Sequence, residues 1–184
     1  MKKSYNFLIL LLLIFINLKM QAQPRRYVAR TFYFDLITYQ HSLGAGIYGS
    51  KDAANWGVSY SPRANLIMLG NNSISLGMPL GLGLSNKGPG GVKLTYNIPF
   101  VFDFNLGHNA LAENTRGFGG FFGAGYGFSS LRAEFGESRS QGLFFNAGAR
   151  GLISDYSFTL RASYILALKK ESPNVSSVGI QYNF

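Results

Sequence analysis

Large apolar residues alternate with small or polar ones through most of the chain. In residues 74–84 every even position is a large aliphatic residue and every odd position is Ser, Gly or Pro. Residues 92–106 follow the same rule, with Lys93, Thr95, Asn97, Asp103 and Asn105 on the face opposite an apolar one. A period of two over such lengths predicts β-strands rather than helices.

The same period predicts six further strands, which brings the expected total to eight. These strands are residues 43–48, 56–60, 122–128, 145–149, 156–166 and 178–184, and turn-forming clusters such as residues 70–73 and 85–91 separate the eight. A β-sandwich and a lipocalin-like soluble barrel would also alternate in this way. The strand count alone therefore leaves the architecture open.

The face opposite the apolar one decides between these architectures. It consists mostly of Gly, Ser, Asn and Thr with few charges, which would make a poor water-facing surface but suits the narrow interior of a small barrel. The apolar face then points toward lipid, where every backbone group must be paired and strands can cross only as a closed barrel. The sequence predicts an all-β protein, an eight-stranded antiparallel up-and-down transmembrane β-barrel over residues 41–184.

The N-terminus has the pattern of a secretory signal. Lys2 and Lys3 precede an apolar run at residues 7–16, and Ala22 offers a small residue at the cut. The run is shorter than the roughly 20 residues that a membrane helix needs. We expect residues 1–22 to be a cleaved signal peptide and residues 23–40 to be a periplasmic segment or an extension of the first strand.

Composition agrees with export into an envelope. Only 14% of residues are charged, the chain has no Cys, and the net charge is +9. The lack of Cys excludes disulfides and thiolate metal sites. Because an exported protein does not usually meet nucleic acid, we expect no nucleic-acid partner and expect the basic residues to face anionic lipid head groups or lipopolysaccharide.

The signal segment, the eight alternating stretches and the ending Tyr182-x-Phe184 resemble small outer-membrane β-barrels of the OmpA/OmpX type and related porin-like proteins. The resemblance covers roughly residues 43–184 and rests on pattern rather than on a strict motif. It implies a Gram-negative outer-membrane location. It also implies that Val178, Ile180, Tyr182 and Phe184 form the closing-strand signal read by the barrel-assembly machinery.

Two sets of residues are expected to have defined places in such a barrel. Lys93, Asp103, Arg150 and Arg161 should face the lumen, where unpaired charges are costly. We expect Asp103 to form an ion pair with Arg150, Arg161 or both and so to plug the interior; a selectivity ring in a conducting pore is the alternative. At the membrane interfaces, an aromatic girdle is expected from Trp56, Phe104, Tyr156 and Tyr182.

No constellation in the sequence points to catalysis, a cofactor or a metal. Residues 44–49 match GxGxxG, but a turn rather than a helix is expected to follow. The two histidines, His41 and His108, are predicted to lie at the inner rim, away from a serine and carboxylate. The sequence favours a structural, adhesion or interaction role with an unidentified surface partner. The alternatives are a narrow porin, favoured by a continuous aqueous lumen, and a lipid-modifying enzyme, favoured by a Ser–His pair within hydrogen-bond reach.

Overall fold

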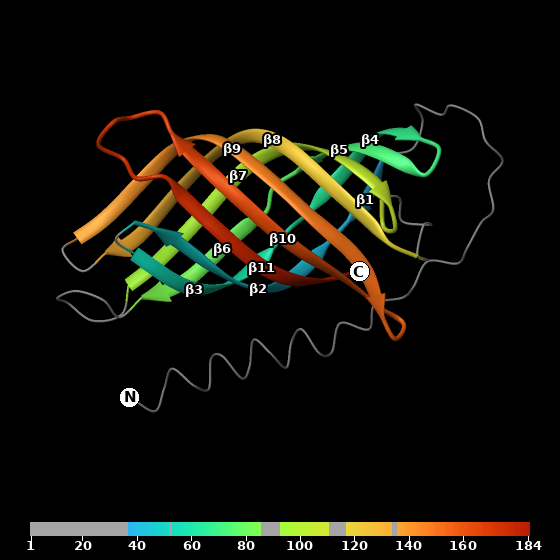
Figure 1. Cartoon of the computed structure of the whole chain (residues 1–184), viewed down its shortest axis with the longest axis horizontal. Helices are drawn as coiled ribbons and strands as arrows, with labels where there is room; N and C mark the ends of the chain where they lie inside the picture. The colour runs from blue at the N-terminus through green and yellow to red at the C-terminus, as the bar shows by residue number, and fades with distance from the viewer. Residues whose placement is uncertain (1–36, 52, 86–92, 111–116, 134–135) are drawn as a thin grey trace.

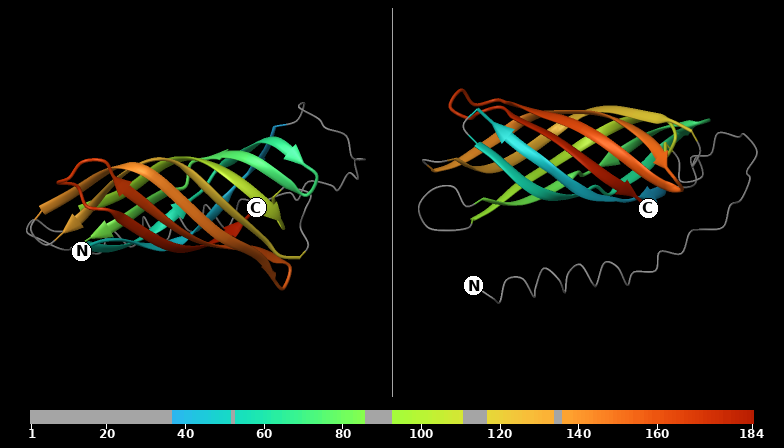
Figure 2. Two further views of the ribbon diagram at one scale, coloured as in Figure 1. Left: turned by 45° about the horizontal axis from the view of Figure 1, so that its top comes forward. Right: turned by 60° about the horizontal axis from the view of Figure 1, so that its bottom comes forward.

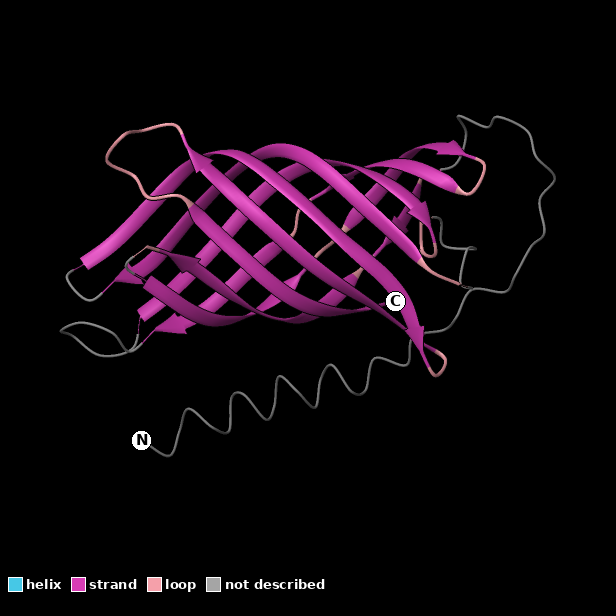
Figure 3. Cartoon of the chain, in the orientation of Figure 1, coloured by secondary structure: helices cyan, strands magenta, loops and turns pink. Residues whose placement is uncertain are grey.

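The computed structural model describes residues 37–51, 53–85, 93–110, 117–133 and 136–184, which form an all-β barrel (Figures 1 and 3). The predicted signal peptide and most of the predicted segment 23–40 lie outside these ranges. None of the described residues forms a helix long and apolar enough to cross a membrane.

Eleven strands build the barrel wall. They are β1 Thr38–Gln40, β2 Ser42–Ser50, β3 Ala53–Tyr60, β4 Arg63–Leu69, β5 Asn72–Gly77, β6 Leu80–Ser85, β7 Lys93–Gly107, β8 Gly119–Ala133, β9 Gly136–Ile153, β10 Tyr156–Ala167 and β11 Val175–Asn183. The pairs β1/β2, β3/β4 and β5/β6 each form one interrupted wall strand, because both members of a pair hydrogen-bond to the same neighbouring wall. All pairings are antiparallel, and the contacts β7–β8 and β2–β11 close an eight-stranded barrel, which confirms the expected fold.

The interruptions have local causes. Pro62 and Pro79 lack the backbone N–H that a strand ladder needs, and each lies in a break between two strands of one wall. The Pro62 carbonyl still accepts a hydrogen bond from the Met78 amide at 3.0 Å, so the walls stay joined across both breaks. At the third break, His41 exchanges two backbone hydrogen bonds with Phe184, at 2.9 and 3.2 Å. The last residue of the chain therefore closes the barrel against the first wall.

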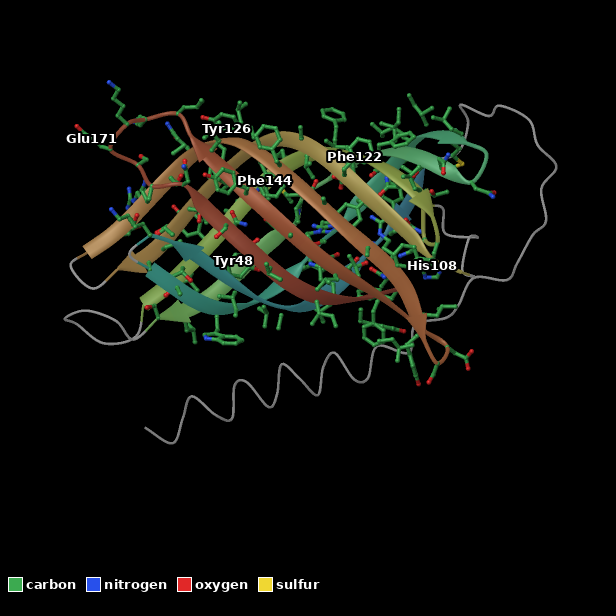
Figure 4. The ribbon with its side chains drawn as sticks, in the orientation of Figure 1. Tyr48, His108, Phe122, Tyr126, Phe144 and Glu171 are labelled. Atoms are coloured by element: carbon green, nitrogen blue, oxygen red, sulfur yellow. The ribbon has the colours of Figure 1, made fainter. Side chains whose placement is uncertain are left out.

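The barrel has two distinct ends. The last residues of β2, β6, β8 and β10 lie at one end, here the loop end, and Phe184 lies at the other, here the C-terminal end, with the last residues of β4, β7 and β9 (Figures 1 and 2). Glu171 marks the loop end and His108 the C-terminal end in Figure 4. The two ends place different side chains at the two mouths of the lumen.

Large apolar side chains face outward around the whole barrel, as the alternation predicts. The exposed set includes Trp56, Val58, Leu82, Leu84, Leu94, Phe100, Phe102, Phe122, Tyr126, Leu143, Phe145, Leu160, Val178 and Ile180. Figure 4 shows Phe122 and Tyr126 on this outer surface. Most buried side chains between them are polar, which is the inverse of a soluble barrel.

The lumen is not uniformly polar, in contrast to the interior that the sequence predicts. Toward the loop end the lumen also holds a cluster of buried apolar side chains, and we call this cluster the apolar layer. It consists of Tyr48, Ala53, Val101, Leu131, Phe144, Ile165 and Val175. Adjacent aromatic residues split between the two faces, so that Phe144 points inward and Phe145 outward. Buried polar side chains such as Asn55 and Ser129 share this half of the lumen, and the buried arginines Arg63 and Arg150 lie nearer the C-terminal end.

Candidate functional site

Three arginines occupy the polar part of the lumen and, with Asp103 and Asn105, form what we call the arginine cluster. Arg63 begins β4, Arg150 lies near the end of β9, and Arg161 is central in β10. Arg63 and Arg150 are 9% and 2% exposed. Three guanidinium groups thus face one carboxylate in the described lumen, an excess of positive charge that burial makes costly.

Arg63 and Arg150 share the same two hydrogen-bond acceptors. Both donate to Asn105 Oδ1, from Arg63 Nη1 at 2.9 Å and from Arg150 Nη2 at 2.8 Å. Both also donate to the backbone carbonyl of Asn109, Arg63 through Nη2 and Arg150 through Nη1 at 3.4 Å. Gln40 Oε1 accepts from Arg63 Nε at 2.7 Å. Strands far apart in sequence are thereby tied together at the C-terminal mouth.

The predicted ion pair of Asp103 with Arg150 or Arg161 is not formed. Within the described residues no lysine or arginine nitrogen lies within 4.0 Å of the Asp103 carboxylate, and its buried Oδ1 has no hydrogen-bond partner. Attraction between Asp103 and the arginines therefore acts over a longer distance. Lys93 pairs with Ser85 at the loop end, and its side chain is outside the described part of the chain.

An inward-facing phenylalanine lies between two of the arginines. The guanidinium carbon of Arg150 is 4.3 Å from the centroid of the Phe121 ring, and that of Arg161 is 4.9 Å from it. Both distances fall within the range of cation–π contacts, which stabilise desolvated cations. Gly148 makes room for the ring, because a Cβ there would lie 2.5 Å from two of the Phe121 carbons.

The connection after β7 turns back into the C-terminal mouth. Asn109 adopts a positive φ of 55° and Gly107 one of 63°, which together reverse the chain. Ala110 is fully buried, and its carbonyl accepts a hydrogen bond from Ser73 Oγ at 2.6 Å. Gln40 Nε2 donates to Asn109 Oδ1 at 2.8 Å. The turn at residues 107–110, which we call the mouth turn, therefore closes this end of the lumen.

His108 contacts a serine, which the sequence analysis did not expect. His108 Nε2 and Ser157 Oγ lie 2.9 Å apart, and Asn183 Nδ2 donates to the same hydroxyl at 2.9 Å. The histidine is 1% exposed, at the C-terminal end (Figure 4). This is the Ser–His geometry that would favour an enzyme, although the ring is shielded from solvent.

A small cavity lies between the apolar layer and the arginine cluster. Its lining includes Tyr48, Asn97, Phe144, Arg161 and Gln181, and its volume is about 20 Å³, enough for one water molecule. Arg161 Nε, Asn97 Oδ1 and Gln181 Oε1 are buried without a hydrogen-bond partner among the described residues.

Aromatic side chains gather where β11 closes on the first wall. His41 stacks between the rings of Tyr60 and Phe184, with centroids 5.9 and 5.8 Å away, and Tyr60 Oη lies 2.8 Å from His41 Nδ1. Tyr182 continues the row, with Phe184 on one side at 6.2 Å and Tyr156 on the other at 6.0 Å. We call this row the seam cluster.

The remaining residues predicted for the girdle lie apart from the seam cluster. Phe104 packs against Phe122, with centroids 5.6 Å apart, and Trp56 lies near the loop end, paired with Ile47 and Leu84. Tyr156 and Tyr182, in contrast, meet at the C-terminal end. Trp56 and Tyr156 thus point outward at opposite ends of the barrel, and their role as membrane anchors stays a prediction.

The predicted assembly signal occupies one face of β11. Val178, Ile180, Tyr182 and Phe184 all point outward, and β11 pairs with β10 on one side and β2 on the other. Their recognition by an assembly machinery stays a prediction. The GxGxxG stretch at residues 44–49 lies inside β2, which continues as strand to Ser50.

Arg63, Asn105 and Phe121 are central to the lumen but absent from the predicted set. Ser59, Ser61 and Arg63 stand at alternate positions, so the alternation continued past Pro62 places Arg63 in the lumen. Asn105 was assigned to the inner face without a role. Phe121 gave no signal, because it stands beside Phe122 and either could have faced inward.

Comparison with known proteins finds similarity of structure but no match in sequence. No protein-family model and no curated protein matches the chain. Among solved structures, the N-terminal β-barrel domain of Pseudomonas aeruginosa OprF is 14% identical, with a TM-score of 0.49 over 81% of this chain and all of that one. Neisserial surface protein A is 14% identical, with a TM-score of 0.48 over 79% of this chain and 92% of that one. Ail, the attachment invasion locus protein of Yersinia pestis, is 15% identical, with a TM-score of 0.45 over 79% and 97%.

Proposed function

We propose that this chain is an integral outer-membrane β-barrel protein with a structural, adhesion or interaction role in the cell envelope. The observation that carries the proposal is the inverted distribution of side chains: large apolar groups face outward around the whole barrel, whereas the lumen holds three arginines and many amides and hydroxyls. In water this arrangement would expose a large apolar surface at a cost of about 25 cal/mol per Å². A bilayer removes that cost, and closure of the barrel pairs each of its eight walls with a wall on either side.

A filled interior favours a structural or interactive role over transport. The apolar layer lies in the loop half of the lumen, the mouth turn contacts Arg63, Arg150 and Ser73 at the C-terminal end, and the cavity between them is about 20 Å³. A narrow porin needs a continuous aqueous path, and the packing of the described side chains argues against one. An eight-stranded barrel in any case encloses just enough space for its own side chains.

The experiment that tests the proposal is heat-modifiability of the protein extracted from the cell envelope with detergent. We expect a compact, faster-migrating band in unboiled samples and a slower band after boiling, because the closed hydrogen-bond network resists detergent at room temperature. Recovery of the mature chain as a monodisperse protein in detergent-free buffer would contradict the proposal.

We infer that the loop end contacts anionic lipid head groups, including the phosphates of lipopolysaccharide. Lys51, Lys169 and Lys170 are exposed there, and the only ion pair among the described residues, Arg139–Glu137 at 2.9 Å, leaves these lysines available. Each basic residue near an anionic surface contributes about 1 kcal/mol. Charge reversal of Lys169 and Lys170 should lower the amount of lipopolysaccharide that copurifies with the barrel; an unchanged amount would argue against this contact.

A second candidate function, a membrane-embedded acyl hydrolase, follows from the Ser157–His108 pair. In that case Ser157 Oγ would attack an acyl ester carbonyl while His108 Nε2 takes its proton; the ester C–O bond would break as His108 gives the proton to the leaving alcohol, and water would then release the acyl group from Ser157. A fluorophosphonate probe distinguishes the two functions, since it reacts with activated serines. The structural role predicts no labelling of the folded barrel, whereas labelling that Ser157→Ala abolishes would establish the hydrolase.

A further inference from the structure

Two guanidinium groups converge on a pair of uncharged oxygens at the C-terminal mouth. Arg63 and Arg150 each direct one nitrogen to Asn105 Oδ1 and another to the carbonyl oxygen of Asn109. The two cations thus present their flat, forked faces to one small volume. This is the arrangement in which arginines bind the two oxygens of a carboxylate or phosphate.

The acceptors present do not neutralise the two cations. An amide oxygen carries only a partial negative charge, and no ion pair joins Asp103 to either arginine in the described structure. Arg161 adds a third buried cation nearby, and its Nε has no partner among the described residues. Because buried charges are costly unless paired, binding an anion at the C-terminal mouth would stabilise these arginines.

The orientation of Asn105 is fixed by its other contacts. Its Nδ2 donates to Ser75 Oγ at 2.8 Å, to the Asp103 carbonyl at 3.3 Å and to the Ser73 carbonyl at 3.4 Å. Oδ1 is therefore held toward the two arginines, and the side chain is fully buried. A carboxylate built at this position would place one oxygen between both guanidinium groups, while its other oxygen would replace Nδ2 and lose the hydrogen bonds to the Ser73 and Asp103 carbonyls.

We propose that Arg63 and Arg150 form a binding site for a small oxyanion carrying a phosphate or carboxylate group. The carbonyl of Asn109 holds the place of one anion oxygen, and an arriving anion takes over the hydrogen bonds that this carbonyl accepts. In the structure, the mouth turn therefore occupies the site with its own backbone carbonyl. The inference concerns the lumen and is independent of the envelope role proposed above.

The test measures the unfolding temperature of the full chain, folded in zwitterionic detergent, by the loss of the fast-migrating band on heating. Inorganic phosphate is the probe, and sodium chloride at equal ionic strength controls for screening. Phosphate should raise the midpoint by a few degrees and chloride should not, because a ligand that binds only the folded state stabilises it by mass action. An equal effect of both salts on the wild type would overturn the proposal.

Two asparagine variants separate the site from a general charge effect. Asn105→Asp supplies a built-in carboxylate, so it should abolish the response to phosphate; neutralising the two arginines offsets its loss of the Nδ2 hydrogen bonds, so its midpoint without phosphate should stay above that of the control below. Asn55→Asp makes the same change at another buried, inward-facing asparagine, on β3 in the loop half, and should lower the midpoint. If Asn105→Asp lowers the midpoint by as much as Asn55→Asp does, or keeps the phosphate response, the proposal is wrong; if Asn105→Asp does not fold, the wild-type comparison of phosphate with chloride decides.

A third arm identifies the source of the anion. The barrel is moved to phosphatidylcholine vesicles with or without phosphatidylglycerol, and the midpoint is compared with and without free phosphate. A rise that requires free phosphate supports a dissolved ligand, and a rise with phosphatidylglycerol alone, absent in Asn105→Asp, supports a head group. No rise in either case overturns the site.

Discussion

At the scale of single residues, glycines on the inner face of the wall make room for large side chains in the lumen. Gly148 on β9 is paired with Phe121 on the adjacent strand β8, whereas Gly81 on β6 makes room for Tyr48 on β2, two strands away, where a Cβ would lie 2.5 Å from the tyrosine hydroxyl. The Phe121 ring in turn contacts the guanidinium groups of Arg150 and Arg161. A change at one glycine therefore reaches the buried cations through the ring.

This pairing predicts that Gly148→Ala destabilises the barrel by about 1–3 kcal/mol, the usual cost of overpacking a filled core. The added methyl group would lie 2.3 Å from the Leu160 carbonyl oxygen and 2.5 Å from two Phe121 carbons, so it strains the pairing with β10 and forces Phe121 away from the arginines. The measurement is urea unfolding of the barrel in detergent micelles. Gly151→Ala, on the same strand, is the matched control, because the nearest atom to its Cβ is 3.8 Å away. Equal stabilities of the two variants would refute the pairing.

The sequence predicts which residues face the lumen, but it does not predict their hydrogen-bond partners there. Asp103, Arg150 and Arg161 were placed in the lumen by parity alone, and the structure brings them into one cluster. The expected ion pair failed because the choice of acceptor depends on register and reach across strands. Asn105, rather than Asp103, lies level with the ends of Arg63 and Arg150.

At the scale of elements, β11 makes the closure and the seam cluster. Its last residue exchanges backbone hydrogen bonds with His41, and its outward rings stack on residues of β10 and of the first wall. Phe184 thus contributes both a backbone pair and a ring contact at the join. This gives a physical reason for an aromatic residue at the end of the strand pattern.

We therefore expect Phe184→Ala to slow the folding of urea-denatured chain into detergent micelles. Loss of stacking removes about 0.5–1.5 kcal/mol for each aromatic pair. The measurement is the rate at which the fast-migrating band appears. Phe100→Ala removes a comparably exposed ring from β7, away from the seam, and should fold at close to the wild-type rate. A defect of the same size in both variants would contradict a special role for the seam.

The strand boundaries show where pattern reading loses information. Residues 74–84 were expected as one strand, and their alternation does continue without a change of face, yet Pro79 divides them into β5 and β6. The alternation of inward and outward side chains does not depend on the backbone N–H that proline lacks. It therefore continues through Pro79, although the backbone hydrogen bonding between strands is interrupted there. The inward fold of the mouth turn depends on contacts with Arg63 and Ser73, which no local pattern carries.

At the scale of the whole molecule, the filled lumen predicts that the barrel does not conduct. Reconstituted in a planar bilayer, the protein should give no stable single-channel current, because the apolar layer and the mouth turn interrupt any aqueous path. The control is the bilayer after addition of a known porin. A steady current in the wild type that is lost in Arg161→Ala would contradict the filled lumen and would support a selective pore.

The central claim is that the apolar face of the barrel looks outward into acyl chains, and the single tryptophan tests it most directly. Trp56 is 72% exposed on the outer surface and is the chain's only tryptophan, so its fluorescence reports one position. The barrel is folded into vesicles whose acyl chains carry bromine near the head group. The account predicts strong quenching by these lipids and weak quenching by iodide in the water. Strong quenching by iodide with none by brominated lipid would contradict it.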